Sequence, residues 1–191
     1  VAALLTIGKK GCRRKRNRNR KIVSVFSMWI VMAVIWLTGA LSPATLEAAP
    51  PRSVVPPPAP AVYTLNELEQ KAVMLLNAAR KAEGLEPLKV NLLLSKLAAD
   101  YALDMNKRKF FAHVDPDGKD PFDRMAAIGI DYPNAGENIA LSPDVETAHK
   151  MLMDSPLHRE NIMQPKYTEI GIGVRPDSRG GVYLVQEFIG P

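Results

Sequence analysis

The sequence predicts an α+β fold, with helices in the first part of one domain and strands in the last part. Two observations lead to this prediction. Apolar residues recur every three or four positions in several segments between residues 64 and 162, as on the buried face of a helix. Residues 169–189 instead alternate and are rich in β-branched side chains, which favours strands. A chain of 191 residues with 47% hydrophobic content can form one domain with a core, plus additional segments.

The expected helices follow from capping and breaking residues. The first begins at Thr64-Leu-Asn-Glu67, which fits a capping box, and ends near Gly84. Its apolar stripe consists of Leu65, Leu68, Ala72, Leu75, Leu76 and Ala79. A second helix is expected over Leu92–Lys107. Three shorter helices are expected where a capping residue precedes a proline, at Asp120-Pro121, Ser142-Pro143 and Ser155-Pro156.

The strands are expected at the C-terminal end. Glu169–Val174 and Gly181–Ile189 have the alternation of strands, and Asp177–Gly181 between them has the composition of a turn. These residues therefore predict an antiparallel hairpin. Helices followed by strands, without regular alternation of the two, define the α+β class.

The net charge of +5 is divided unevenly along the chain. Residues 1–60 hold ten Lys and Arg and one acidic residue, a net charge of +9. Residues 61–191 hold fifteen Lys and Arg and nineteen Asp and Glu, a net charge of −4. A mildly acidic domain lacks the basic surface of a nucleic-acid binder, so we expect no nucleic-acid partner.

The N-terminal part is typical of a membrane-targeting segment. A basic run at Lys9–Lys21 precedes twenty uncharged residues, Ile22–Leu41, a length between a signal h-region and a spanning helix. We expect residues 1–21 to be a basic cytoplasmic n-region and residues 22–42 to be a signal peptide h-region or a signal anchor. The basic run alone would also fit a nuclear-localisation or RNA-binding patch, but the apolar segment that follows it argues against this.

The remainder is expected to lie outside the cytoplasm. The positive flank stays on the cytoplasmic side, so everything after the apolar segment is exported, either secreted or anchored to the cell membrane. Residues 43–61 contain seven prolines and predict an extended linker. Residues 62–190 form the folded domain. The chain has a single cysteine, Cys12, so the domain has no disulfide, cysteine nucleophile or thiolate zinc site.

Three short segments of the domain carry residues suited to chemistry. His113 lies in Phe110–Gly118, before an Asp-Pro-Asp-Gly turn. Glu137 follows a glycine in Asn134–Ala140, and we expect it to point inward from a loop. His158 lies in the first turn of the short helix that begins after Ser155.

Each of these residues also has an ordinary structural explanation. His113 could cap the second helix, Glu137 could accept backbone hydrogen bonds in a loop, and His158 could lie on the surface of its helix. We interpret Ser155 as a helix N-cap rather than a nucleophile, and His149 as a solvated surface residue. Asp115 and Asp117 lack the spacing of an EF-hand loop and fit turn chemistry better.

Together the segments resemble the bacterial branch of the CAP (SCP-like) superfamily. This group includes cysteine-rich secretory proteins, insect venom antigens and plant pathogenesis-related proteins. The resemblance extends over most of the folded part, through Leu65–Asn77, Phe110–Gly118, Gly136–Ala140, Ser155–Ile162 and Tyr183–Phe188.

The resemblance implies a three-layer α-β-α sandwich around a small antiparallel sheet. It also implies a cleft with two histidines and two acidic side chains, which in some members hold Zn²⁺ or another divalent metal. The matching residues are His113, Glu137 and His158 as metal ligands, with Gln186 as a further residue of the cleft. The fourth metal ligand is either Asp154 or Glu187.

Three functions are compatible with these features. The leading hypothesis is an extracytoplasmic module that binds a lipid, peptide or cell-wall ligand, with or without a divalent metal. The alternatives are a metal-dependent hydrolase acting on peptide or cell-wall substrates, and a structural cell-wall adhesin. The sequence has neither an HExxH nor a Gly-x-Ser-x-Gly motif, so it favours binding over catalysis.

Overall fold

The structure is a computed structural model that describes residues 3–10 and 63–191. These two stretches belong to one compact unit. The predicted apolar segment at residues 22–42 and the linker at 43–61 lie outside the described residues. No helix in the described stretches is long and apolar enough to cross a membrane.

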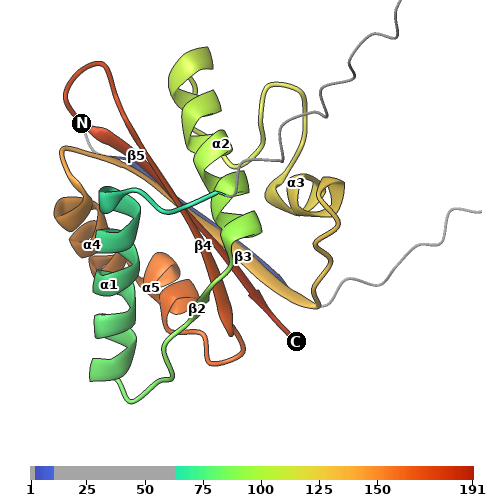
Figure 1. Cartoon of the computed structure of the whole chain (residues 1–191), viewed down its shortest axis with the longest axis vertical. Helices are drawn as coiled ribbons and strands as arrows, with labels where there is room; N and C mark the ends of the chain where they lie inside the picture. Colours follow the sequence, from blue (N-terminus) through green and yellow to red (C-terminus); the bar gives the residue numbers. More distant parts are fainter. Residues whose placement is uncertain (1–2, 11–62) are drawn as a thin grey trace, which may run out of the picture. The chain divides into compact units, whose positions relative to one another are not determined.

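The domain has three layers (Figure 1). Three helices cover one face of a central sheet: α1 (Glu67–Ala82), α4 (Val145–Asp154) and α5 (Pro156–Ile162). Two helices cover the other face: α2 (Leu92–Arg108) and α3 (Pro121–Ala127). The α+β class and the three-layer arrangement predicted from the sequence are therefore confirmed.

The strands form one sheet of order β1-β3-β5-β4-β2. Their bounds are β1 (Ala3–Lys10), β2 (Lys89–Val90), β3 (Asn134–Ser142), β4 (Glu169–Pro176) and β5 (Val182–Gly190). Neighbouring strands are antiparallel, except that the two-residue β2 runs parallel to β4. The predicted hairpin is present as β4 and β5. The sheet places β3 and β5 at the centre of the fold, with Glu137 directly opposite Glu187.

Two helix starts differ from the sequence prediction. The capping box of α1 is formed by Asn66 and Glu69, not by Thr64 and Glu67. Asn66 accepts a hydrogen bond from the Glu69 amide at 3.0 Å, and the Glu69 carboxylate accepts one from the Asn66 amide at 2.9 Å. Helix α4 begins after Asp144, whose side chain accepts from the amide of Thr147, and not after Ser142-Pro143. In both cases a side chain two residues further along satisfies the free amides of the first turn.

The segment around Glu137 is a strand, not the loop that the sequence suggested. Residues 134–142 pair with β5 along their whole length. Helices cover both faces of the sheet, so residues on both sides of β3 are buried. Because a strand buried on both faces does not alternate between polar and apolar residues, its sequence shows no period of two. This explains why the strand could not be recognised from its pattern.

Helix α2 packs closely on the sheet because β4 contributes two glycines to the contact. A Cβ atom at Gly171 would overlap the backbone and side chain of Leu94, and one at Gly173 would overlap the backbone of Ala98. Apolar clusters therefore fill both sides of the sheet. Between the apolar groups on the α2 face lies a set of charged side chains.

Candidate ligand-binding site

Two glutamates occupy the centre of the α2 face of the sheet. Glu137 of β3 and Glu187 of β5 are cross-strand neighbours, and both side chains are fully buried. Two adjacent buried carboxylates are unfavourable unless a countercharge or a proton compensates them. Arg124 supplies a countercharge to Glu137. Glu187 has a raised pKa, which favours its protonated form.

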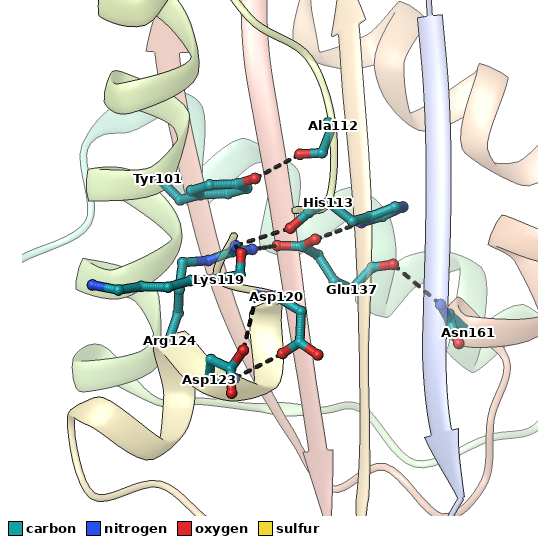
Figure 2. A network of polar contacts seen from close by, with 9 residues as sticks. All are labelled: Tyr101, Ala112, His113, Lys119, Asp120, Asp123, Arg124, Glu137 and Asn161. Carbon is teal, nitrogen blue, oxygen red and sulfur yellow. Dashed lines mark hydrogen bonds and ion pairs between the residues drawn. The ribbon is translucent and has the colours of Figure 1, made fainter. Parts of the chain in front are cut away.

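Glu137 is held by a cation and by an imidazole, as Figure 2 shows. Its Oε2 accepts a hydrogen bond from Nη2 of Arg124 at 2.6 Å. Its Oε1 lies 2.5 Å from Nδ1 of His113. The prediction that Glu137 points inward is confirmed, although its partners are side chains and not the backbone amides of a loop.

Arg124 stabilises the loop that carries His113 through hydrogen bonds to its backbone. Helix α3 places this arginine against the sheet, with its guanidinium carbon 3.4 Å from the centroid of the Tyr101 ring. Its Nη1 donates to the carbonyl oxygens of His113 at 2.9 Å and Lys119 at 3.1 Å. The Tyr101 hydroxyl donates to the carbonyl of Ala112 at 2.6 Å. Burial raises the pKa of Tyr101, so its hydroxyl remains a donor.

Hydrogen bonds within residues 115–119 also stabilise the loop that carries His113. Oδ1 of Asp115 accepts hydrogen bonds from the amides of Asp117 and Lys119, both at 2.9 Å, and the Gly118 amide donates to the Asp115 carbonyl. These contacts form the turn that the Asp-Pro-Asp-Gly sequence predicts. As a result, the position of His113 is fixed from both sides.

The contacts of His113 indicate which of its nitrogens carries a proton. An ionised carboxylate only accepts hydrogen bonds, so Nδ1 must donate to Glu137. In a neutral imidazole, Nε2 then has a free lone pair. This atom is buried and has no hydrogen-bond partner among the described residues, while the side chain keeps 12% of its surface exposed. His113 is therefore arranged to accept a hydrogen bond from, or coordinate, an incoming group.

Glu187 is the second acidic residue of the pair. Neither of its carboxyl oxygens has a hydrogen-bond partner within the described residues. Burial, followed by the nearby charge of Glu137, raises the pKa of Glu187 well above its ordinary value. Glu187 therefore keeps its proton to a higher pH than an exposed glutamate, whereas Glu137 is paired with the Arg124 cation.

A second polar group lies on the opposite face of the same strands. Asn138 donates to the carbonyl of His158 and to Oε1 of Gln186, both at 3.1 Å. Asn161 of α5 donates to Oδ1 of Asn138 at 3.0 Å and to the carbonyl of Glu137 at 3.4 Å. Gln186, predicted as a cleft residue, thus belongs to a buried network of amides.

His158 is buried and not on the surface, which corrects the structural explanation considered for it. Its Nδ1 lies 2.7 Å from Oγ of Ser155. Ser155 occupies the N-cap position of α5, but its side chain makes no capping hydrogen bond, contrary to the expectation. The described contacts of His158 are on the α5 face, whereas His113 and Glu137 meet on the α2 face.

Two other residues differ from their expected roles. Asp154 forms an ion pair with Lys150 at 2.5 Å, and both side chains are largely exposed. Of the two acids considered as a fourth ligand, Glu187 is the one placed next to Glu137. His149 is half-buried and not solvated, and burial lowers its pKa.

The described residues do not fit a metal site as they are arranged. No group of three or more His, Cys, Asp or Glu side chains within residues 3–10 and 63–191 could hold a metal ion. Both oxygens of Glu137 already have partners. Zn²⁺ or another divalent ion at His113, Glu137 and His158 therefore stays a prediction, and nothing below depends on a metal.

Arg124 and Tyr101 were not recognised as site residues from the sequence. Arg124 lies in a seven-residue helix whose short apolar pattern does not reveal which side faces the sheet. The available signal was the position of Arg124. It is a charged residue next to Met125, at a position that must face the interior. Tyr101 lies in the helix expected over residues 92–107, but its hydroxyl contact with the carbonyl of Ala112 depends on tertiary structure.

The three-layer fold and the buried His–Glu pair define a domain of the CAP type. The description of the cysteine-rich secretory protein family (CAP) matches residues 73–188. The chain belongs to this family.

Two similar proteins come from Bacillus subtilis. The chain is 38% identical over 154 residues to the uncharacterized protein YkwD of Bacillus subtilis (strain 168), covering 80% of this chain and 56% of YkwD. It is 30% identical over 122 residues to the uncharacterized membrane protein YlbC of the same strain, covering 63% of this chain and 34% of YlbC. The chain thus spans little more than half of the first relative and about a third of the second.

A solved structure also matches the domain. The crystal structure of an extracellular protein containing a SCP domain from Bacillus anthracis str. Ames superposes with a TM-score of 0.60 at 27% identity. The match covers 64% of this chain and 40% of that protein.

Proposed function

We propose that this chain is an extracytoplasmic CAP domain that binds a ligand at His113, with Nε2 of the imidazole as the point of contact. The observation that carries the proposal is the buried Nε2 without a described partner, on a ring held by Glu137. A buried polar atom without a partner is unfavourable. Nδ1 of His149 is also buried without a partner among the described residues, so what distinguishes Nε2 of His113 is the orientation that Glu137 gives to its ring.

A cavity of about 400 Å³ lies at the start of the loop that leads to His113. Its lining combines apolar and aromatic side chains with charged and polar ones: Lys109, Phe110, Phe111, Leu141, Asp177, Ser178, Arg179 and Tyr183. His113 is not part of this lining, so the proposal does not depend on the cavity.

Two further observations support a location outside the cytoplasm. The basic run and uncharged segment of residues 9–41 have the composition of an export signal. In addition, one similar protein is a membrane protein and one similar structure is that of an extracellular protein.

The proposal can be tested with His113→Ala and the matched control His149→Ala, which changes a histidine of α4 on the other face. The full-length variants are incubated with peptidoglycan sacculi and with phosphatidylglycerol vesicles, and the bound fraction is measured by co-sedimentation. We expect His113→Ala to lose binding to the probe that the wild type retains, and His149→Ala to keep it. Equal retention of all three proteins, or no binding by the wild type, would contradict the proposal.

The same geometry favours hydrolysis as a second candidate function. A histidine whose Nδ1 donates to a carboxylate can take a proton from water or a hydroxyl through Nε2. Release of fluorescent fragments from labelled casein or labelled sacculi would measure this activity. Turnover that disappears in His113→Ala but persists in His149→Ala would favour the hydrolase, whereas binding without turnover would favour the binding module.

A further inference from the structure

The outer edge of β3 accepts a complete antiparallel strand. Residues 3–10 pair with β3 over eight consecutive positions, from Ala3 opposite Leu141 to Lys10 opposite Asn134. This strand comes from the far N-terminal end of the chain, and residues 11–62 lie between it and the rest of the domain. Without it, β3 would be an edge of the sheet.

Strand β3 has few of the usual features that protect an edge. It is nine residues long and contains neither proline nor lysine. Its one charge, Glu137, is turned inward, which is one such feature, and is held by Arg124 and His113. By contrast, the opposite side of the sheet carries the two-residue β2, and β4 ends with Arg175 and Pro176. A long regular edge without proline or lysine is a template for pairing.

The edge is also adjacent to the proposed binding point. The register places position 7 of β1 opposite Glu137, the residue that holds His113. Figure 2 shows β1, in blue, running alongside β3 with Asn161 beyond it, and β1 also contacts α5. A strand at this edge therefore lies between the loop of His113 and helix α5.

We propose that the ligand of this domain is an extended peptide segment of a partner protein, which adds to β3 as an antiparallel strand next to His113. The inference rests on the proposed function and specifies its ligand class. The edge offers a row of backbone N–H and C=O groups, and only another backbone can complete such a ladder. Strand addition of this kind is an established mode of peptide recognition. The seating of Ala3–Lys10 shows that the edge can take an eight-residue segment in regular register.

The occupant is a separate peptide and not residues 3–10 because of the topology of the chain. If residues 22–41 are inserted in the membrane with the basic run inside, residues 3–10 remain in the cytoplasm while β3 is outside. The two segments are then in different compartments and cannot pair. Export thus frees the edge for a peptide from the surroundings.

A direct test uses full-length chain in which Thr6→Pro and Ile7→Pro are combined. Successive backbone amides of a strand point to opposite sides, and proline has no N–H. Two adjacent prolines therefore remove an amide donor on each side of the strand, so the variant leaves the β3 edge open. The probe is a fluorescent peptide with the sequence of residues 3–10, Ala-Leu-Leu-Thr-Ile-Gly-Lys-Lys, and the control peptide carries the two prolines. Binding is measured by fluorescence anisotropy, and amide hydrogen exchange is followed for residues 134–142.

We expect the probe to bind the variant and to slow exchange within residues 134–142, and the control peptide to do neither. The wild-type protein should bind the probe at least roughly tenfold more weakly than the variant does, because its own residues 3–10 compete for β3 at high effective concentration. Equal binding by wild type, with the same protection, would also support the acceptor edge and show that it is open in the full-length chain. Absence of binding, or binding without protection of residues 134–142, would overturn the proposal.

The His113→Ala variant separates this inference from the proposed function. Loss of the Nε2 contact should weaken probe binding in a Thr6→Pro/Ile7→Pro/His113→Ala protein, but the main-chain ladder does not depend on it, so the probe should still slow exchange within residues 134–142. Failure of the proposed function would appear as retained sacculus or vesicle binding in His113→Ala. Failure of the strand inference would appear as unprotected β3 amides.

Discussion

The two faces of strands β3 and β5 carry different kinds of polar network. On the α2 face, Glu137 and Glu187 form a charged centre with Arg124 and His113. On the α5 face, the neighbouring residues Asn138 and Gln186 form a centre of neutral amides with Asn161. Successive residues of a strand point to opposite faces, so one step along the chain separates the two networks.

The difference also distinguishes the surroundings of His113 and His158. A buried carboxylate orients the ring of His113 and leaves Nε2 facing away from Glu137. The ring of His158 instead contacts the hydroxyl of Ser155, which carries no charge. The charged face has a functional atom at its edge, and the amide face chiefly holds α5 against the sheet.

The largest loss of stability is expected when the cation of the charged face, Arg124, is removed. Arg124→Ala leaves the Glu137 carboxylate buried beside a second acid, without its countercharge, and we expect a loss of about 3 to 5 kcal/mol in the free energy of unfolding. Urea denaturation monitored by circular dichroism measures this value. A loss below about 1 kcal/mol would show that solvent or another cation reaches Glu137.

Two controls separate charge from packing in this experiment. Arg159→Ala removes an arginine whose ion pair with Glu83 is largely exposed, and should cost about 0 to 1 kcal/mol. The double variant Arg124→Met/Glu137→Gln removes both charges and should be more stable than Arg124→Met alone.

A smaller loss is expected when the amide face is broken. Asn138→Leu removes the partner of the His158 carbonyl, of Gln186 and of Asn161, while keeping a side chain of similar size. Unsatisfied but uncharged groups should cost about 1 to 3 kcal/mol. Asn106→Ala, which affects an exposed contact, is the control. If Asn138→Leu cost more than Arg124→Ala, the proposed ranking of the two faces would be wrong.

The raised pKa of Glu187 predicts the sign of a pH dependence of stability. Because the folded-state pKa of Glu187 is raised, the native protein keeps a proton that the unfolded chain releases above its ordinary pKa. Native stability from this group is therefore fully present at low pH and falls as pH rises through the window between the two pKa values. The slope is at most about 1.4 kcal/mol per pH unit.

Glu187→Gln removes this titration while keeping a neutral polar group of the same shape. Its stability relative to wild type should be near zero at pH 4 and should grow toward pH 8, as measured by urea denaturation at each pH. A difference that shrinks with rising pH would mean that Glu187 is ionised in the folded protein.

The sequence predicts those elements that have their own local signals. The capping and breaking residues around α2 and α3, and the turn between β4 and β5, lead to correct boundaries within a few residues. The loop of His113 is also predicted correctly, because the turn chemistry of Asp115 and Gly118 is local.

The features that could not be predicted depend on distant contacts. Strand β3 is buried on both faces, so its pattern lacks the alternation of a strand. Arg124 reaches Glu137 only because α3 packs on the sheet, and no spacing in the sequence indicates this. His158 comes from α5, on the other face of the sheet from α2, and resemblance to a family motif does not show this.

The central claim of this account is that Glu137 fixes His113 with a proton on Nδ1 and a free lone pair on Nε2. Long-range ¹H–¹⁵N correlation spectra of the ¹⁵N-labelled protein at pH 8 distinguish the two tautomers of each histidine ring. We predict that His113 is in the Nδ1–H form, and that Glu137→Gln, whose amide no longer offers the charged acceptor, weakens this preference. An Nε2–H tautomer for His113 in the wild type would contradict the account.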